Sequence, residues 1–287
     1  MKTLLIIDSN QLCYSAFYRT GNLTYKGKDT GIIFGFLVEL FGIVKYFKAI
    51  DYTIVFTWDS RKNFRKYDYI PYKQGRAKKR KEVGLEQKHY KQFDELRKEI
   101  LPQIGFRNIF MEVGFEADDI IAQLCQQYQL RRKIIVSTDE DLYQLLDMET
   151  DIYKTKSKKL YTMDHLFKEY PGLISTRNWI DVKALAGCST DNVKGITGVG
   201  YKTAVAYLSA SLNKDSKIYK KIITKHSQRR YRRNLPLVTI PYPEEEIKNF
   251  KIKKNRLNYE AFSFLCTDLG FRSIEKNMKA WAENFKF

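Results

Sequence analysis

The stretch TLLIID (Thr3–Asp8) decides the class of fold, because its Leu and Ile side chains run without a break to a single acid. A short apolar run of this kind is typical of a strand that is buried on both faces of a parallel sheet. Three further stretches have the same character, and each ends in acid or leads directly into it: YTIVFTWD (Tyr52–Asp59), RNIFMEVG (Arg107–Gly114) and RKIIVSTDED (Arg132–Asp141). Between the first two strands, GIIFGFLVELFGIVKYF (Gly31–Phe47) is apolar at helical spacing and predicts a buried crossover helix. The pattern predicts an α/β fold with a mostly parallel central sheet flanked by helices.

The composition indicates a globular protein with a polyanionic partner. A chain of 287 residues with 44% hydrophobic side chains can bury a core. The 51 Lys and Arg residues exceed the 33 Asp and Glu residues by 18, and an excess of this size favours nucleic acid as the partner. An anionic membrane surface is the weaker alternative, since no amphipathic basic helix with exposed apolar anchors is evident.

The sequence contains no signal for export or membrane insertion. The apolar start of the chain reaches Asp8 after a few residues, and no apolar run is long enough to cross a bilayer, so we expect a cytoplasmic protein with no membrane partner. The cysteines are far apart and form no CxxC pair, which argues against a zinc site or a disulfide framework. They are Cys13, Cys125, Cys188 and Cys266.

A strongly basic, aromatic segment, Arg61–Lys98, interrupts the alternation of strands and helices. It is too polar to be core and too long for an ordinary loop between a strand and a helix, so we interpret it as a functional insertion. Its middle part, Lys73–Lys81, is compatible with a helical or a mobile conformation. Its second part predicts a helix from the spacing of Tyr90, Phe93, Leu96 and Ile100.

Seven acids fall near the predicted carboxyl ends of strands, where ligands bind in an open parallel sheet. Taken singly, each has a structural explanation: Asp139 as a helix N-cap, Asp8 as a turn residue, and the group around Glu116 as a complement to a helix dipole. Asp139 and Asp141 are two residues apart and can point the same way if the chain is still extended there. The seven acids are Asp8, Asp59, Glu116, Asp118, Asp119, Asp139 and Asp141.

Taken together, the acids predict a site for divalent cations. Like charges about 4 Å apart repel by on the order of 4 kcal/mol at an effective dielectric constant near 20, so a bound cation would offset their repulsion. All-oxygen ligands suit Mg²⁺, for which Mn²⁺ can substitute, and the three histidines are not clustered with the acids. Carboxylate-bound Mg²⁺ beside a basic surface is the arrangement needed to hydrolyse phosphodiesters.

An ordered set of motifs resembles the flap endonuclease and 5′-3′ exonuclease family. The motifs are IIDSN, FTWDS, YKQGR, EADD, STDEDL, DNVKGITGVGYKTA and RNLPLV, and they span nearly the whole chain. The chain is most similar to the stand-alone bacteriophage 5′-3′ exonucleases and to the 5′-nuclease domain of bacterial DNA polymerase I. The resemblance implies a PIN-like nuclease core over residues 1–175, with a helical arch insertion at about 61–104. It also implies a helical DNA-binding region over residues 176–287 that packs on the core.

The resemblance assigns the acids to two metal ions. The first ion would be held by Asp8, Asp59, Glu116 and Asp118, and the second would be served by Asp119, Asp139 and Asp141.

The resemblance also assigns roles to residues of the arch and of the first helix. Lys73 and Arg76 would contact the scissile phosphate and stabilise its charge, which places them with Asp8 and Asp139 among the catalytic residues. Tyr14 would stack on a base near the cut. Tyr72 could do likewise, and core packing is the alternative for both rings.

One position departs from the family's pattern. The family usually has a Gly-Asp-x-x-Asp pattern before its Gly-rich hairpin, whereas this chain has GCSTDN, with Cys188 at the first acid and Asp191 at the second. A thiol is a poor ligand for Mg²⁺. We therefore expect the second or an outlying metal ion to bind more loosely, or Asp191 and water to suffice.

The stretch GITGVGYKTAVAYL (Gly195–Leu208) predicts a phosphate contact. Gly198 and Gly200 permit a tight turn whose backbone N–H groups can meet a phosphate at the start of the next helix, and Lys202 adds positive charge. Read alone, Gly-x-Gly before a helix is often only a turn. The resemblance implies a helix-hairpin-helix (H3TH) clamp on duplex DNA, with a K⁺ ion held there by main-chain carbonyls.

The resulting hypothesis is a structure-specific 5′-nuclease, with flap endonuclease and 5′-3′ exonuclease activities on branched or 5′-ended DNA and two-metal-ion catalysis. It would act in replication, removing RNA primers and flaps, or in repair. We expect a monomer with DNA, RNA–DNA primers and a replication protein as partners, in the cytoplasm of an infected bacterium if the chain is phage-encoded.

Three alternatives stay open. A PIN-type ribonuclease has a similar acidic sheet, although such proteins are shorter and lack the insertion and the hairpin. A Toprim-type nuclease would explain STDED but not Lys73. The non-enzymatic alternative is a branched-DNA binding module with weakened catalysis.

Overall fold

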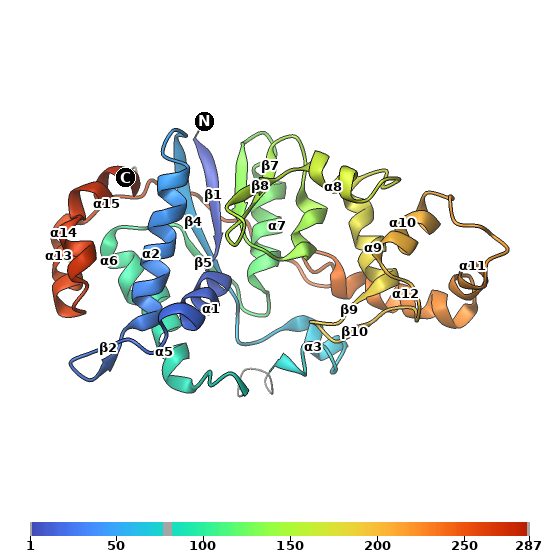
Figure 1. Cartoon of the computed structure of the whole chain (residues 1–287), viewed down its shortest axis with the longest axis horizontal. Coiled ribbons are helices and arrows are strands. Elements are labelled where there is room, and N and C mark those ends of the chain that lie inside the picture. The colour runs from blue at the N-terminus through green and yellow to red at the C-terminus, as the bar shows by residue number, and fades with distance from the viewer. Residues whose placement is uncertain (1, 77–81, 286–287) are drawn as a thin grey trace.

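The computed structural model describes residues 2–76 and 82–285, and a six-stranded sheet lies at its centre (Figure 1). The strand order is β5-β4-β1-β6-β7-β8, and every neighbouring pair is parallel except β7 with β8. The expected α/β class with a mostly parallel sheet is therefore confirmed. The strands of this sheet are β1 (Thr3–Asp8), β4 (Tyr52–Trp58), β5 (Ile109–Met111), β6 (Lys133–Val136), β7 (Thr150–Lys154) and β8 (Lys159–Tyr161). Two short antiparallel pairs lie outside it: β2 (Thr24–Tyr25) with β3 (Lys28–Asp29), and β9 (Gly187–Cys188) with β10 (Val193–Lys194).

Helices connect and cover the strands. None of those described combines the length and the apolar character that crossing a bilayer requires. The α-helices are α1 (Ser9–Thr20), α2 (Gly31–Tyr46), α3 (Phe64–Asp68), α5 (Gln87–Glu95), α6 (Leu101–Ile104), α7 (Ala117–Gln127), α8 (Met163–Glu169), α9 (Trp179–Ala186), α10 (Tyr201–Leu208), α11 (Lys217–Ile222), α12 (Lys225–Val238), α13 (Tyr259–Asp268), α14 (Arg272–Lys276) and α15 (Met278–Phe285). The described residues also form a π-helical turn, η1 (Leu96–Ile100), and two 3₁₀ turns, η2 (Glu140–Leu145) and η3 (Thr176–Asn178).

The side chains of β1 alternate between two hydrophobic cores. Leu5 and Ile7 belong to the core that contains the apolar side chains of α2 and of the C-terminal helices α13–α15. Leu4 and Ile6 belong to the core that contains α7 and α9. Because successive side chains of a strand point to opposite faces, helices cover the sheet on both sides. Figure 1 shows α13–α15 at one end of the molecule and α10–α12 at the other, with the sheet between them.

The topology brings three strand ends together. β1 is central, with β4 on one side and β6 on the other, and the register pairs Asp8 with Thr57 and Ile7 with Val136. The chain leaves β1 toward β4 and later returns to β6 on the opposite side of β1. A crevice outside the carboxyl ends of such strands is where open α/β sheets bind their ligands.

Several local predictions are confirmed and others are wrong. The crossover helix is confirmed as α2, and the helix expected around Tyr90 is confirmed as α5. The basic insertion is not wholly outside the core, because Phe93 joins the α2 core; within the predicted Lys73–Lys81 stretch, residues 77–81 lie outside the described residues. The strand expected to reach Asp141 ends at Val136; Asp139 still has an extended backbone, with φ of −75° and ψ of 126°, but Asp141 lies in the 3₁₀ turn η2.

Candidate active site

A pocket of about 410 Å³ opens at the carboxyl ends of β1, β4 and β6. Five carboxylates line it, of which Glu140 is exposed and the other four are at least partly buried. Asp8 ends β1, Asp59 follows β4, Asp118 lies in the first turn of α7, and Asp139 follows β6. Four segments far apart in the sequence therefore place acidic side chains around one pocket, as the strand-end argument predicted.

These four acids, which we call the unpaired acids, accept hydrogen bonds only from neutral donors. Asp8 is the N-cap of α1, with Oδ1 3.1 Å from the Gln11 nitrogen and Oδ2 3.0 Å from Oγ of Ser137. Asp59 accepts from the Ala117 nitrogen at 2.9 Å, and Asp139 accepts from the nitrogen of residue 141 at 2.9 Å. Across residues 2–76 and 82–285, none of the four forms an ion pair, and we find no hydrogen bond to the carboxylate of Asp118.

Burial and mutual repulsion disfavour the charged form of several unpaired acids. Burial, with the charges of Asp59 and Asp139, raises the pKa of Asp8 to about 7. Burial, with the charges of Asp139 and Asp8, raises the pKa of Asp118 well above its usual range. The pKa of Asp59 is raised by burial and by Glu116, against an opposing attraction from Lys73. An all-oxygen set of carboxylates without basic contacts fits a hard divalent cation, which would restore their charged forms.

Four further acids, which we call the paired acids, each contact a basic side chain. Arg65 binds Asp119 through two hydrogen bonds of 2.7 Å, and Lys183 Nζ lies 2.5 Å from Asp141 Oδ1. Lys73 contacts Glu116, and Arg76 contacts Asp191. The paired acids are Glu116, Asp119, Asp141 and Asp191.

Asp119 has a different setting from the unpaired acids. The residue is fully buried, and its carboxylate also accepts hydrogen bonds from the backbone nitrogens of Glu116 and Tyr242, both at 2.9 Å. Both oxygens are therefore engaged by Arg65 and by the backbone. This geometry assigns Asp119 to fixing the start of α7, so we leave it out of the metal ligands that we propose.

The start of α7 is organised by Glu116, which is the N-cap of this helix. Burial opposes its charge, but contacts with Lys73, Arg65 and the Tyr72 hydroxyl lower the pKa of Glu116 to about 2. The hydroxyl of Tyr72 donates to Glu116 Oε2 at 2.8 Å, and its ring is 3% exposed. In this structure the ring has the packed setting that was the alternative, and stacking of Tyr72 on a base stays a prediction.

Tyr14 has a different setting, since its ring lines the pocket and is only partly buried. It meets the ring of Phe93 edge to face, with 5.4 Å between the ring centroids. Contact with a base at this position stays a prediction.

Lys73 and Arg76, from the basic insertion, also line the pocket. Lys73 has a left-handed backbone, with φ of 54°, and its nitrogen donates to the Asp191 oxygen at 2.8 Å. Burial opposes the charge of Lys73, but Glu116 and Asp191 raise its pKa. A strained backbone of this kind costs on the order of 1 kcal/mol or more and is concentrated at functional sites.

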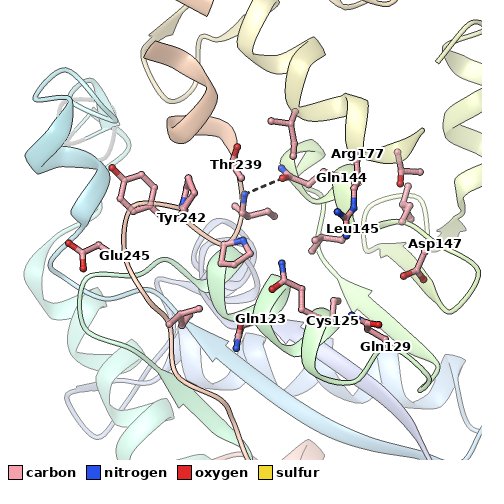
Figure 2. A pocket seen from close by; sticks show the side chains of 18 of the residues that line it. Gln123, Cys125, Gln129, Gln144, Leu145, Asp147, Arg177, Thr239, Tyr242 and Glu245 are labelled. Carbon is pink, nitrogen blue, oxygen red and sulfur yellow. Dashed lines mark hydrogen bonds between the residues drawn. The ribbon is translucent and has the colours of Figure 1, made fainter. Parts of the chain in front are cut away.

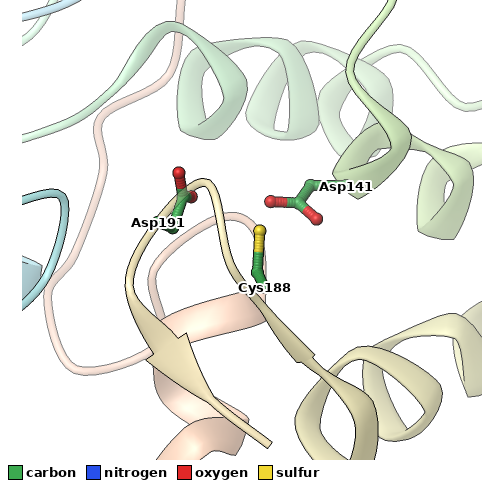
Figure 3. A group of neighbouring side chains, drawn as sticks. All are labelled: Asp141, Cys188 and Asp191. Atoms are coloured by element: carbon green, nitrogen blue, oxygen red, sulfur yellow. The ribbon is translucent and has the colours of Figure 1, made fainter. Parts of the chain in front are cut away.

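Asp141, Cys188 and Asp191 form a cluster beside the pocket (Figure 3). One ligand atom of each lies within 4.8 Å of the others. Burial and the charge of Asp139 raise the pKa of Asp141 to about 6, against an opposing attraction from Lys183. Burial, with the charge of Asp141, raises the pKa of the Cys188 thiol. The position at which the sequence departs from the family's pattern is thus part of the site.

The Gly-rich stretch joins the β9–β10 hairpin to α10. Gly198 has φ of 89°, a value that favours glycine, and Gly200 is the N-cap of α10. Gly198, Gly200 and Lys202 are exposed. Their contact with DNA and with K⁺ stays a prediction.

A larger cleft, of about 750 Å³, lies between α7, η2 and the loop after α12 (Figure 2). Figure 2 shows Gln123 and Gln144 on its walls together with charged side chains such as Asp147, Arg177 and Glu245. Gln144 accepts a hydrogen bond from the Ile240 nitrogen. None of the unpaired acids lines it. We therefore assign the chemistry to the smaller pocket, where charge converges, rather than to the larger one.

Sequence reasoning missed two residues of the site. Arg65, which neutralises Asp119, did not differ from the other basic residues of the insertion. Lys183 is an isolated lysine between Val182 and Ala184 in an apolar helix, and that setting is the signal by which it could have been found.

Comparison with known proteins places the chain in a family. Residues 3–171 match the family model of the 5′-3′ exonuclease N-terminal, resolvase-like domain. A 5′-3′ exonuclease of Buchnera aphidicola is 31% identical over 215 residues, which cover 73% of this chain and 71% of that protein. The chain belongs to the 5′-3′ exonuclease family. This confirms the predicted resemblance and the predicted class of enzyme, a nuclease that hydrolyses phosphodiester bonds.

Two further matches to this family differ in how much they cover. DNA polymerase I of Mycobacterium leprae is 31% identical over 214 residues, which span 71% of this chain but 22% of that protein. The 5′-exonuclease of phage T5, solved with bound zinc ions, is 18% identical with a TM-score of 0.68, and the match covers 98% of this chain and 100% of that one. The second match supports the fold over nearly the whole chain.

Proposed function

We propose that the chain is a structure-specific 5′-nuclease that cleaves branched or 5′-ended DNA with the help of Mg²⁺, for which Mn²⁺ can substitute. The observation that carries the proposal is the group of unpaired acids, which line one pocket together with Lys73 and Arg76 in a chain of the 5′-3′ exonuclease family. Acids and bases in one pocket match the needs of phosphodiester hydrolysis, in which cations must approach a polyanion.

The unpaired acids would hold the divalent ions. Asp8, Asp59, Asp118 and Asp139 supply oxygen ligands only, and Glu116 and Asp141 lie beside them. The bound ions would supply Lewis-acid activation of water and would neutralise charge on the phosphate. Glu116, Asp141 and Asp191 are ligands in the proposal only after their basic partners release them.

Lys73 and Arg76 would bind the scissile phosphate. In the structure both cations contact acids, Lys73 with Glu116 and Arg76 with Asp191, so that they are held at the pocket before DNA arrives. Exchange of these carboxylates for phosphoryl oxygens would place two donors where negative charge builds during hydrolysis. Tyr14, at the same pocket, would stack on the base next to the cut.

The exposed residues Gly198, Gly200 and Lys202 would bind the duplex as a helix-hairpin-helix clamp, with K⁺ held by main-chain carbonyls. α9 and α10 pack against each other on either side of the β9–β10 hairpin, which is the arrangement such a clamp requires. RNA–DNA primers as substrates, a monomeric state, a replication protein as partner and a cytoplasmic location complete the proposal.

Cleavage of a 5′-flap duplex with Mg²⁺, compared with the same reaction in EDTA, tests the proposal. We expect cleavage only with Mg²⁺, a large loss in Asp139→Asn through impaired metal use, and in Lys73→Ala a lower turnover with the metal dependence unchanged. Binding of the flap without cleavage would favour the branched-DNA binding module. Equal cleavage of unbranched RNA would favour the ribonuclease.

A further inference from the structure

Lys183 is a buried cation at the edge of the candidate active site. The residue belongs to α9 and is 3% exposed. Its Nζ lies 2.5 Å from Asp141 Oδ1, donates to the hydroxyl of Tyr201 at 3.2 Å, and lies 4.0 Å from the Cys188 sulfur. A buried ammonium group is tolerated only when a partner compensates its charge, and Asp141 is that partner.

The ammonium group balances the charge of the Asp141, Cys188 and Asp191 cluster (Figure 3). Asp191 has a cation of its own, because Arg76 Nη2 contacts its Oδ1. The thiol of Cys188 adds no charge near neutral pH, since an ordinary thiol has a pKa of about 8.5. Lys73 Nζ also lies 3.7 Å from Asp191 Oδ2, although Lys73 is shared with Glu116. The two carboxylates are therefore balanced by basic side chains without any bound ion.

The charges of the nearby unpaired acids are not balanced by contacts with basic side chains of the described residues. The charge of Asp139 acts on both the cluster and the unpaired acids. It repels Asp141 of the cluster, and it repels Asp8 and Asp118 among the unpaired acids. A divalent ion gains more from carboxylates that no cation contacts than from carboxylates that already hold one.

We propose that Lys183 is a positioning residue whose ammonium group takes the place of a divalent ion beside Asp141, so that the cluster binds a divalent ion weakly and the unpaired acids bind first. The inference rests on the proposed function, because it requires that the unpaired acids bind a divalent ion. Cys188 maintains the balance, since an acid at this position would add a third negative charge facing the same basic side chains.

The test is Mn²⁺ binding to the full chain without DNA, followed by electron paramagnetic resonance of the free ion. We expect wild type to show one tight class of sites. In Lys183→Met the cluster should bind Mn²⁺ at least about tenfold more tightly than the wild-type cluster does, because Asp141 loses its ammonium partner. Adding Asp141→Asn to Lys183→Met should remove this gain.

Three variants serve as controls. Lys183→Arg keeps the charge and should bind Mn²⁺ as wild type does. Lys154→Met removes a partly buried lysine that donates to the Tyr143 hydroxyl at 2.5 Å, away from both groups of acids, and should also behave as wild type. Lys183→Gln, which is uncharged but can still bond to Tyr201, should repeat the gain of Lys183→Met and replaces it if that variant does not fold.

The possible failures are distinguishable. Unchanged Mn²⁺ binding in folded Lys183→Met or Lys183→Gln would overturn the role of Lys183, and so would an equal gain in Lys154→Met. A failure of the role of Lys183 leaves the proposed function in place if wild type binds Mn²⁺ and Asp118→Asn does not. Equal Mn²⁺ binding by wild type and Asp118→Asn would overturn both proposals.

Discussion

The unpaired acids and the paired acids meet at the same edge of the sheet and differ in what neutralises them. Glu116, Asp119, Asp141 and Asp191 contact Lys73, Arg65, Lys183 and Arg76 in turn. Asp8, Asp59, Asp118 and Asp139 have hydrogen bonds from neutral donors or none within the described residues. In a chain with a net charge of +18, basic side chains are plentiful, yet none within the described residues contacts the unpaired group. The difference indicates where an external cation is needed and where the fold supplies its own.

The largest effect is expected for Asp118→Asn, which removes a charge from the unpaired acids and should change activity and stability in opposite directions. Loss of one ligand and one charge should lower the rate of flap cleavage by on the order of 10³-fold, the range seen when a single electrostatic contact to the transition state is removed. The same change should raise the free energy of unfolding in EDTA, because it removes a repelled and buried charge. Cleavage rates and urea denaturation measure the two effects. A variant that is less stable than wild type in EDTA would contradict the view that the charge of Asp118 is unfavourable in the folded chain without metal.

The opposite result is expected for Asp119→Ala, which removes an acid from the paired group. It leaves the Arg65 guanidinium buried without its partner, and breaking a buried ion pair in this way costs about 3–5 kcal/mol of stability. Urea denaturation measures the loss, and Arg65→Met combined with Asp119→Leu, which removes both charges, should recover part of it. A loss below about 1 kcal/mol for Asp119→Ala would show that this pair does not fix the start of α7.

The pH dependence of stability distinguishes the acids whose pKa is raised from Glu116, whose pKa is lowered. The pKa of Asp8 is raised to about 7 and that of Asp141 to about 6, so the unfolded chain releases these protons at lower pH than the folded chain does. Stability in EDTA should therefore fall as the pH rises from about 4 to about 7. Glu116, whose pKa is lowered to about 2, acts in the opposite sense, and its contribution is lost as the pH falls from about 4 through about 2. Thermal unfolding midpoints at pH 5 and pH 7.5 check the prediction, and saturating Mg²⁺ should shrink the difference. No fall in wild type, or an equal fall in Asp8→Asn, would contradict it.

The smallest effect is expected for Cys188→Asp. An added carboxylate beside Asp141 and Asp191 should lower the Mg²⁺ concentration needed for half-maximal cleavage by a few-fold, because the new charge still faces Lys183 and Arg76. A Mg²⁺ titration of flap cleavage measures the shift. A curve identical to that of wild type would show that the residue at this position does not influence metal binding.

The sequence predicted the unpaired group well because its members depend on local rules. Asp8, Asp59 and Asp139 follow buried strands, and parallel strands that share a sheet bring their carboxyl ends together whatever the intervening chain does. The structural explanation of Asp139 as a helix N-cap is also correct, because it caps η2, whereas Asp8, expected as a turn residue, caps α1. One carboxylate can cap a helix and line a ligand pocket at the same time.

The paired group could not be predicted in the same way, because its basic partners come from distant segments. Arg65 lies 54 residues from Asp119, and Lys183 lies on a helix that no strand rule connects to Asp141. Pattern alone cannot show which of many basic residues packs against which acid. The sequence could not show that Arg65 holds Asp119 or that Tyr72 bonds to Glu116, since these contacts form only in the folded chain. A metal-binding role for Asp119 and base stacking by Tyr72 stay predictions.

The most direct test of the account is to locate Mn²⁺ by anomalous diffraction in crystals of the wild-type chain without DNA. We expect the strongest anomalous peak in the pocket, coordinated by carboxylate oxygens of Asp8, Asp59, Asp118 or Asp139. We also expect weaker or no density at Asp141, Cys188 and Asp191, and none at Asp119. A dominant peak held by the paired acids, with the unpaired acids free of metal, would contradict it.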